Sequence, residues 1–122
     1  MGHKFLWIDI PVLDLDRAIR FYSAVLGEPV KKDILPSSAI GVLPHADGEV
    51  SGCLFKNPNE KPSGHGPLIY LNCSGRLEAA IQAAKDGGGK VLQGLHSIGP
   101  YGSRAIIEDS EGNRLALHSD SN

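Results

Sequence analysis

The sequence predicts an α+β protein built from two tandem βαβββ modules, and three observations lead to this prediction. Residues 5–27 have the pattern of a strand, a turn and an amphipathic helix that ends at a glycine. The same pattern returns from Leu68, and the two copies align at a single sequence offset. Short strand-like runs follow each helix. Because each module has one apolar sheet face to cover, the modules are expected to pair into a curved eight-stranded mixed sheet with a concave cleft, and with the helices on its convex side.

The first strand and helix are defined by two apolar periodicities and by the residues between them. Pro11 lacks an N–H group, so that end of the first strand is expected to be a sheet edge or the point where the chain leaves the sheet. Asp14 is expected to accept a backbone N–H at the start of the helix, and Gly27 to end the helix in a left-handed conformation. The apolar positions alternate in the strand and recur at helical spacing afterwards: Ile8, Ile10 and Val12, then Leu15, Ile19, Tyr22 and Leu26.

The remaining elements follow from turn residues and short apolar runs. Strands are expected near 29–33, 39–43 and 49–56, and residues 57–67, rich in Pro, Gly and Asn, are predicted to be a linker. The second copy has a strand at 68–73, a helix with its apolar stripe at Leu77, Ala80, Ile81 and Ala84, and strands near 91–92, 104–109 and 114–118. A single domain, 1–122, is therefore predicted, with module 1 at about 5–56 and module 2 at about 68–119.

Composition limits the classes of function. The formal net charge is −2 and the 12 basic residues are scattered, which argues against a nucleic-acid partner. No apolar run approaches the roughly 18 to 20 residues that span a membrane. Cys53 and Cys73 are too few for a disulfide framework, and the N-terminus shows no signal-peptide pattern. A cytoplasmic protein with reduced thiols is predicted.

The motifs, taken in order, resemble the vicinal oxygen chelate superfamily, which contains glyoxalases, bleomycin resistance proteins and ring-cleaving dioxygenases. The resemblance rests on the paired repeat and on three segments: Asp14–Arg17, Phe21–Gly27 and Asp109–Leu115. In metal-using members each module supplies one ligand from its first strand and one from its last. These positions fall on side chains without a suitable lone pair: Trp7, Leu54, Leu68 and Ala116. The resemblance thus implies a member with no metal and no other cofactor. A divalent metal held by a shifted set (Asp9, His96, Glu108 and His118) is the less favoured alternative.

Strand alternation predicts which side chains face the cleft. The expected set is Trp7, Asp9, Leu68, Tyr70, Asn72, Ala116 and His118. Trp7 and Tyr70 would stack on a planar or cationic ligand, with Asp9 as a counter-charge. Asp9 and His118 are the candidate catalytic residues, as an acid/base pair if they meet. These four residues also have ordinary structural interpretations. Asp9 would be a hydrogen-bond acceptor, Trp7 and Tyr70 would fill the cleft, and His118 would be exposed to solvent.

A second candidate region is the loop predicted at residues 96–104. Its Gly and Pro residues separate two strands, and Tyr101 and Arg104 are expected to close over an anionic or aromatic ligand. An ordinary hairpin loop with one exposed Arg is the alternative.

Three functional hypotheses follow. The first is a metal-free protein that binds a small organic molecule through Trp7, Asp9, Tyr70, Asn72, Tyr101, Arg104 and His118. The second is a metal-dependent lyase, isomerase or dioxygenase of the glyoxalase type with rearranged ligands, and the third is a non-catalytic assembly module. The resemblance also implies a homodimer, with modules paired within one chain or exchanged between chains.

Overall fold

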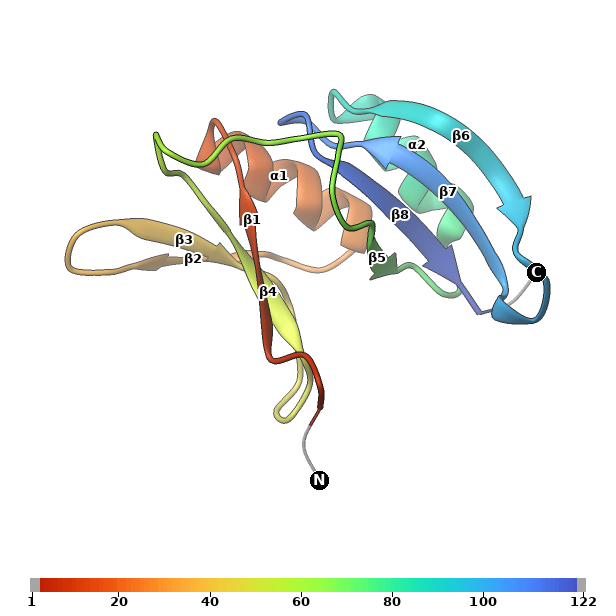
Figure 1. Ribbon diagram of the computed structural model, residues 1–122, viewed down its shortest axis with the longest axis horizontal. Coiled ribbons are helices and arrows are strands. Elements are labelled where there is room, and N and C mark those ends of the chain that lie inside the picture. The colour runs from red at the N-terminus through yellow and green to blue at the C-terminus, as the bar shows by residue number, and fades with distance from the viewer. Residues whose placement is uncertain (1–2, 121–122) are drawn as a thin grey trace.

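The computed structural model describes residues 3–120 and contains the βαβββ order twice (Figure 1). Module 1 consists of β1 (Trp7–Pro11), α1 (Leu15–Leu26), β2 (Lys31–Ile34), β3 (Ala39–Val42) and β4 (Ser51–Phe55). Module 2 consists of β5 (Ile69–Asn72), α2 (Leu77–Asp86), β6 (Lys90–Ser97), the 3₁₀ turn η1 (Gly99–Tyr101), β7 (Ser103–Glu108) and β8 (Arg114–Ser119). The α+β class and the two repeated modules are confirmed.

The eight strands are divided between two four-stranded mixed sheets. Their orders are β1-β4-β3-β2 and β5-β8-β7-β6, and within residues 3–120 no strand pairing joins one sheet to the other. In each sheet the first strand of the module runs parallel to the last strand and occupies an edge. The edge position predicted from Pro11 is therefore confirmed, since its missing N–H lies in an edge strand.

Helix α1 begins and ends where its sequence signals predict. Asp14 Oδ1 accepts the backbone N–H of Arg17 at 3.0 Å, and Gly27 adopts a left-handed conformation at φ 71°. Helix α2 is capped differently, because Arg76 at its N-cap makes no side-chain capping bond. The side chain of Arg76 instead donates to the carbonyls of Val25 and Ala24 at the end of α1.

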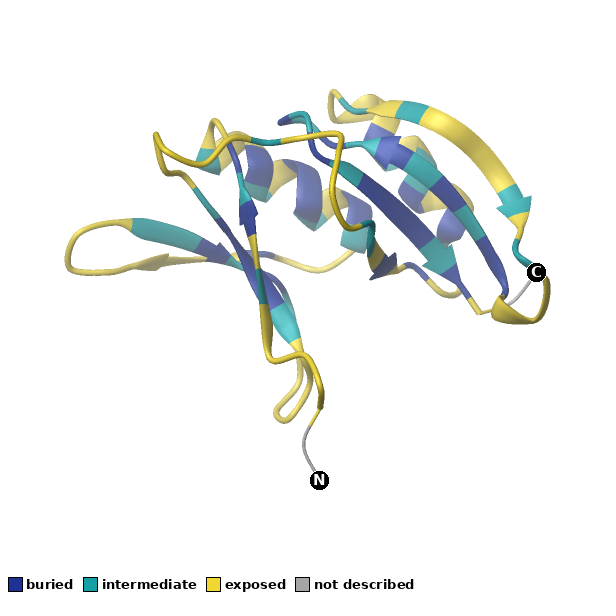
Figure 2. Ribbon diagram, viewed as in Figure 1, coloured by how far each residue is buried: buried dark blue, intermediate teal, exposed yellow. Residues whose placement is uncertain are grey.

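Both modules contribute to one hydrophobic core. Each helix covers one face of its own sheet, and the two helices also pack against each other. Figure 2 shows the result: the inner helix surfaces are buried and the central strands are buried or half-buried, whereas the edge strands β2 and β6 are largely exposed. The uncovered sheet faces consequently point outward, away from the shared core.

The hairpin of β6 and β7 differs from the prediction made for residues 91–104. Strand β6 continues to Ser97, so His96 pairs with Arg104 across the hairpin instead of lying in a loop. The sequence predicted this strand only near residues 91–92. In the structure the pairing of β6 with β7 continues past that segment through irregularities in register between Val91 and His96. The connecting loop is reduced to the residues around η1.

Residues 57–67, predicted to be a linker, contain one isolated bridge between Asn57 and Glu60 and no strand or helix. None of the helices in residues 3–120 has the length and apolar character needed to cross a membrane.

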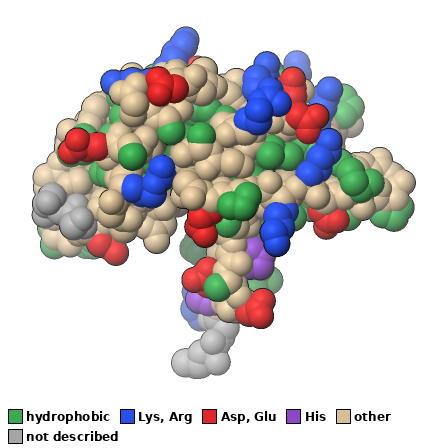
Figure 3. Space-filling view, turned by 180° about the vertical axis from the view of Figure 1, so that it is seen from behind, with side chains coloured by type: hydrophobic (Ala, Val, Ile, Leu, Met, Phe, Trp, Pro, Cys, Tyr) green, Lys and Arg blue, Asp and Glu red, His purple; other side chains and the backbone are tan. Residues whose placement is uncertain are grey.

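Acidic and basic side chains are interspersed over the face seen in Figure 3.

Candidate functional site

The outer face of the first sheet carries a pocket of about 310 Å³ centred on Asp9 and Cys53. These residues are paired across β1 and β4, and the Cys53 thiol donates to Asp9 Oδ1 at 3.3 Å. Burial raises the pKa of the Cys53 thiol, Trp7 lowers it by a smaller amount, and Asp9 raises it further. The pocket is lined by Asp9, Ser38, Ala39, Ile40, Cys53, Phe55, Lys56 and Asn57.

Leu54, which the resemblance placed at a metal-ligand position, does not face the pocket. Leu54 is fully buried in the core, whereas its neighbours Cys53 and Phe55 line the pocket. Leu54 pairs with Ile10, which also lies in the core, so strand alternation places Cys53 opposite Asp9 on the outer face. Successive residues of a strand face opposite sides of the sheet, so a shift of one residue along β4, from Leu54 to Cys53, changes the face.

The outer face of the second sheet carries a separate pocket of about 370 Å³, lined by Tyr70, Ile98, Tyr101, Arg104 and His118. Arg104 donates from one terminal nitrogen to the Tyr70 hydroxyl, and from Nε to His96 Nε2 at 3.0 Å. The Tyr70 and His118 rings meet edge to face at 5.9 Å between centroids. Four residues predicted to bind ligand therefore lie together: Tyr70, Tyr101, Arg104 and His118.

His118 is held by the loop above it. Its Nε2 lies 2.6 Å from the carbonyl oxygen of Tyr101, an acceptor, so Nε2 carries the proton. Its Nδ1 lies 3.9 Å from Asp120 Oδ1, whose side chain is largely solvated. The ring thus links β8 to the loop that forms one wall of the pocket.

The remaining predicted site residues lie elsewhere. Asp9 lines the pocket of the first sheet and His118 that of the second, so the structure does not bring the two candidate catalytic residues into one pocket of the chain. Trp7, 44% exposed, makes an edge contact with His45 at 6.4 Å and lies apart from Tyr70. The Asn72 side chain accepts the backbone N–H of Ser74, which stabilises the turn before α2.

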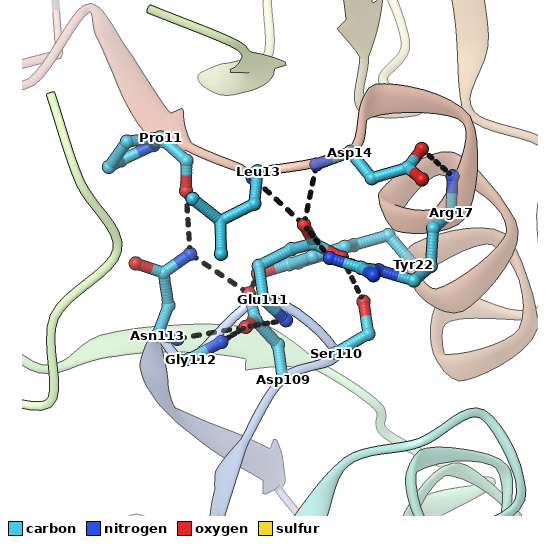
Figure 4. A network of polar contacts seen from close by, with 10 residues as sticks. All are labelled: Pro11, Leu13, Asp14, Arg17, Tyr22, Asp109, Ser110, Glu111, Gly112 and Asn113. Atoms are coloured by element: carbon cyan, nitrogen blue, oxygen red, sulfur yellow. Dashed lines mark hydrogen bonds and ion pairs between the residues drawn. The ribbon is translucent and has the colours of Figure 1, made fainter. Parts of the chain in front are cut away.

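A buried polar network, not anticipated from the sequence, joins the two modules around the β7–β8 turn (Figure 4). Asp109 Oδ1 accepts the N–H groups of Glu111, Gly112 and Asn113, each at 2.8 Å, and its Oδ2 accepts the Tyr22 hydroxyl at 2.5 Å. The Asn113 amide donates to the carbonyl of Pro11 at 2.8 Å. Burial and the Asp109 carboxylate raise the pKa of Tyr22 well above its ordinary value. The network stabilises the arrangement of the modules and lies outside both pockets.

Of the metal-ligand positions inferred from the resemblance, Leu54 lies in the core and Ala116 is fully buried. In the pocket-facing rows, Trp7 pairs with Ser51 and Tyr70 pairs with Ala116. Within residues 3–120, no group of three or more His, Cys, Asp or Glu side chains is arranged to hold a metal ion.

Comparison with known proteins establishes the family. Residues 4–117 match the model of the Glyoxalase/Bleomycin resistance protein/Dioxygenase superfamily, and the chain belongs to this superfamily. It is 32% identical, over 90% of its length and 88% of the relative's, to a "Glyoxylase-like domain-containing protein" of Didymella fabae. It is 26% identical to the "Putative glyoxylase CFP32" of Mycobacterium tuberculosis, but covers only 43% of that protein. A glyoxalase/bleomycin resistance protein from Albidiferax ferrireducens has the same fold, with a TM-score of 0.76 at 17% identity over 96% of this chain and 98% of that one.

Proposed function

We propose that this protein binds a small organic molecule at the outer faces of its sheets and does so without a bound metal ion. The observation that carries the proposal is the set of side chains in the pocket of the second sheet. Tyr70, Tyr101 and Ile98 provide apolar walls, whereas Arg104 and His118 provide polar groups that orient a ligand. Binding sites for small molecules typically combine apolar walls with a few such polar groups.

We also propose that a second copy of the chain completes the site. The two helices pack back to back, so the pockets of one chain face away from each other. Trp7 and Tyr70 remain 44% and 45% exposed beside free strand edges, which suits them to an interface. A homodimer in which β1 of one protomer lies beside β5 of its partner would bring one pocket of each type into a common cleft. This arrangement corresponds to exchange of modules between chains.

The compartment predicted from the sequence is the cytoplasm. Cys53 and Cys73 are free, buried thiols within the described residues, as expected of a protein from a reducing compartment.

The test of metal-independent binding begins with elemental analysis. Protein purified without a histidine tag is analysed before and after soaking in nickel, zinc, iron and manganese, and is then screened against small organic compounds by thermal shift. We expect less than one bound ion per chain and a rise in melting temperature with at least one compound. A stoichiometric ion, with loss of activity on chelation, would favour the metal-dependent lyase, isomerase or dioxygenase instead. The absence of any thermal shift would favour an assembly module.

The oligomeric state is tested separately by light scattering. We expect the mass of a dimer, and a Trp7→Ser variant is expected to dissociate at higher concentrations than the wild type. A matched Leu92→Ser variant changes an apolar side chain that is 53% exposed on β6, the edge of the second sheet opposite β5. This variant should leave the mass unchanged. A monomer mass for the wild type would overturn the proposed dimer.

A further inference from the structure

A row of polar side chains crosses all four strands of the second sheet. The register pairs Asn72 of β5 with His118 of β8, His118 with Arg104 of β7, and Arg104 with His96 of β6. Residues opposite each other in neighbouring strands project from the same face of a sheet. The row therefore lies on the uncovered face, and it includes one cation and no carboxylate.

The contacts of His96 show that it does not neutralise Arg104. Arg104 Nε is only a donor, so His96 Nε2 must accept, and His96 Nδ1 then donates to the Gly94 carbonyl at 2.7 Å. Both contacts require the neutral ring with its proton on Nδ1. His96 thus orients the guanidinium and leaves its charge intact.

Within residues 3–120, no carboxylate forms an ion pair with Arg104. In the part of the chain that the structure describes, Arg104 forms no ion pair, and its hydrogen bonds leave one terminal nitrogen unused. Asp120 is the acidic residue that approaches the pocket, and it lies beside His118 with its side chain 89% exposed. Arg17 provides a contrast, because Glu111 neutralises it through two hydrogen bonds.

The walls around this charge are flat and accessible. Tyr70 is 45% exposed and Tyr101 is 75% exposed, and Ile98 also lines the pocket. A planar guanidinium binds a carboxylate through two parallel hydrogen bonds, and tyrosine faces stack on planar rings. A guanidinium with no ion pair in residues 3–120, in a pocket that two accessible tyrosines also line, matches a ligand with both features.

We propose that the pocket of Tyr70, Tyr101 and Arg104 binds a small aromatic carboxylate. The carboxylate accepts hydrogen bonds from the Arg104 guanidinium, and the ring lies against Tyr70 and Tyr101. This inference rests on the proposed function and specifies the chemical class of its ligand.

The test is isothermal titration calorimetry of the wild-type protein with three probes. Benzoate carries the ring and the charge, benzamide is its neutral counterpart of nearly the same shape, and acetate carries the charge alone. Because a hydrogen bond to a charged group contributes about 1.5–3 kcal/mol, we expect benzoate to bind at least about tenfold more tightly than benzamide. Acetate should bind more weakly than benzoate, since it lacks the ring.

Three variants identify the site. Arg104→Gln should weaken benzoate binding by about tenfold or more, whereas Arg20→Gln, the same change at an exposed position of α1, should not alter it. Tyr101→Ala removes an exposed side chain, so the protein should fold as the wild type does and bind benzoate less tightly.

The proposal would be overturned by equal affinity for benzoate and benzamide, or by equal affinity of the Arg104→Gln and Arg20→Gln variants for benzoate. Absence of benzoate binding up to its solubility limit would also overturn it. If a neutral compound raised the melting temperature in the thermal-shift screen at the same time, the proposed function would stand and only the ligand class would be wrong.

Discussion

Arg17 and Glu111 connect the two modules across 94 residues of sequence, with Arg17 Nε 2.7 Å from Glu111 Oε2. The Glu111 side chain is fully buried, whereas that of Arg17 is 43% exposed. Glu111 also accepts the backbone N–H groups of Leu13 and Asp14, both at 2.8 Å, just before α1. One carboxylate of module 2 therefore holds the start of the helix of module 1. Together with Arg76 at the other end of α1, this contact fixes the back-to-back arrangement from which the outward-facing pockets follow.

Replacement of Glu111 by Gln should destabilise the fold. The variant loses charge-assisted hydrogen bonds at a buried position, so we expect the free energy of unfolding to fall by about 1–3 kcal/mol, as measured by urea denaturation. Asp16→Asn is the matched control, because the ion pair of Asp16 with Lys32 is exposed on both sides and should contribute only about 0–1 kcal/mol. Equal losses in the two variants would show that the Glu111 contact does not couple the modules.

The same carboxylate should make stability dependent on acid pH. Burial opposes ionisation of Glu111, but hydrogen bonds from Arg17, the Asp14 N–H, Ser110 and the Leu13 N–H outweigh it and lower its pKa from 4.5 to about 2. Because the folded protein holds this proton less tightly than the unfolded chain does, the stabilisation is complete above the ordinary pKa and is lost as the pH falls from about 5 to about 2. Melting temperatures of the wild type should decline over this range more steeply than those of Glu111→Gln. Parallel curves would contradict the assignment.

The fold was predictable because each module carries its own local signals. The Asp14 cap, the Gly27 stop and the alternation of Ile8 and Ile10 depend on neighbouring residues, and each appears in the structure as predicted. The relative placement of the modules depends on long-range contacts instead. Tyr22 belonged to an apolar stripe, and nothing in the sequence indicated that its hydroxyl would meet Asp109 in the buried network.

The thiols should be unreactive in the folded protein. Burial raises the pKa values of both Cys53 and Cys73, and the Asp9 carboxylate contributes to the shift at Cys53. Since the thiolate is the reactive form, Ellman's reagent at mildly alkaline pH should modify the native protein about an order of magnitude more slowly than the urea-unfolded chain.

Asp9→Asn supplies the specific test of this arrangement. In a Cys73→Ala background, where Cys53 is the remaining thiol, loss of the Asp9 charge should accelerate modification of Cys53. An unchanged rate would mean that access alone limits the reaction.

Site residues were predictable to the extent that strand alternation and hairpin pairing determined them. Tyr70 and His118 face outward as the alternation implies, and Tyr101 and Arg104 contact the same pocket. The placement of Leu54 at a metal-ligand position did not hold, because β4 pairs Cys53 with Asp9 on the outer face and leaves Leu54 in the core. Knowledge that β4 runs parallel to β1 with Cys53 opposite Asp9 would have corrected it, but register is a tertiary property that a single sequence does not display.

The loop over the second pocket depends on Gly102, and its substitution provides the last prediction. Gly102 has a φ of 99°, and a Cβ at this position would lie 2.1 Å from the carbonyl oxygen of Ser119. Gly102→Ala must therefore shift the backbone beside Tyr101, whose carbonyl holds His118, and we expect lower stability by at least about 1–2 kcal/mol together with weaker binding of benzoate. Gly94→Ala in β6 is the matched control, because its φ lies outside the left-handed region and a Cβ there meets open space. Thermal denaturation and calorimetry of the two variants separate a local effect on the loop from a general effect of the added methyl group. If Gly102→Ala bound benzoate as tightly as Gly94→Ala does, the loop around Tyr101 would have no part in the site.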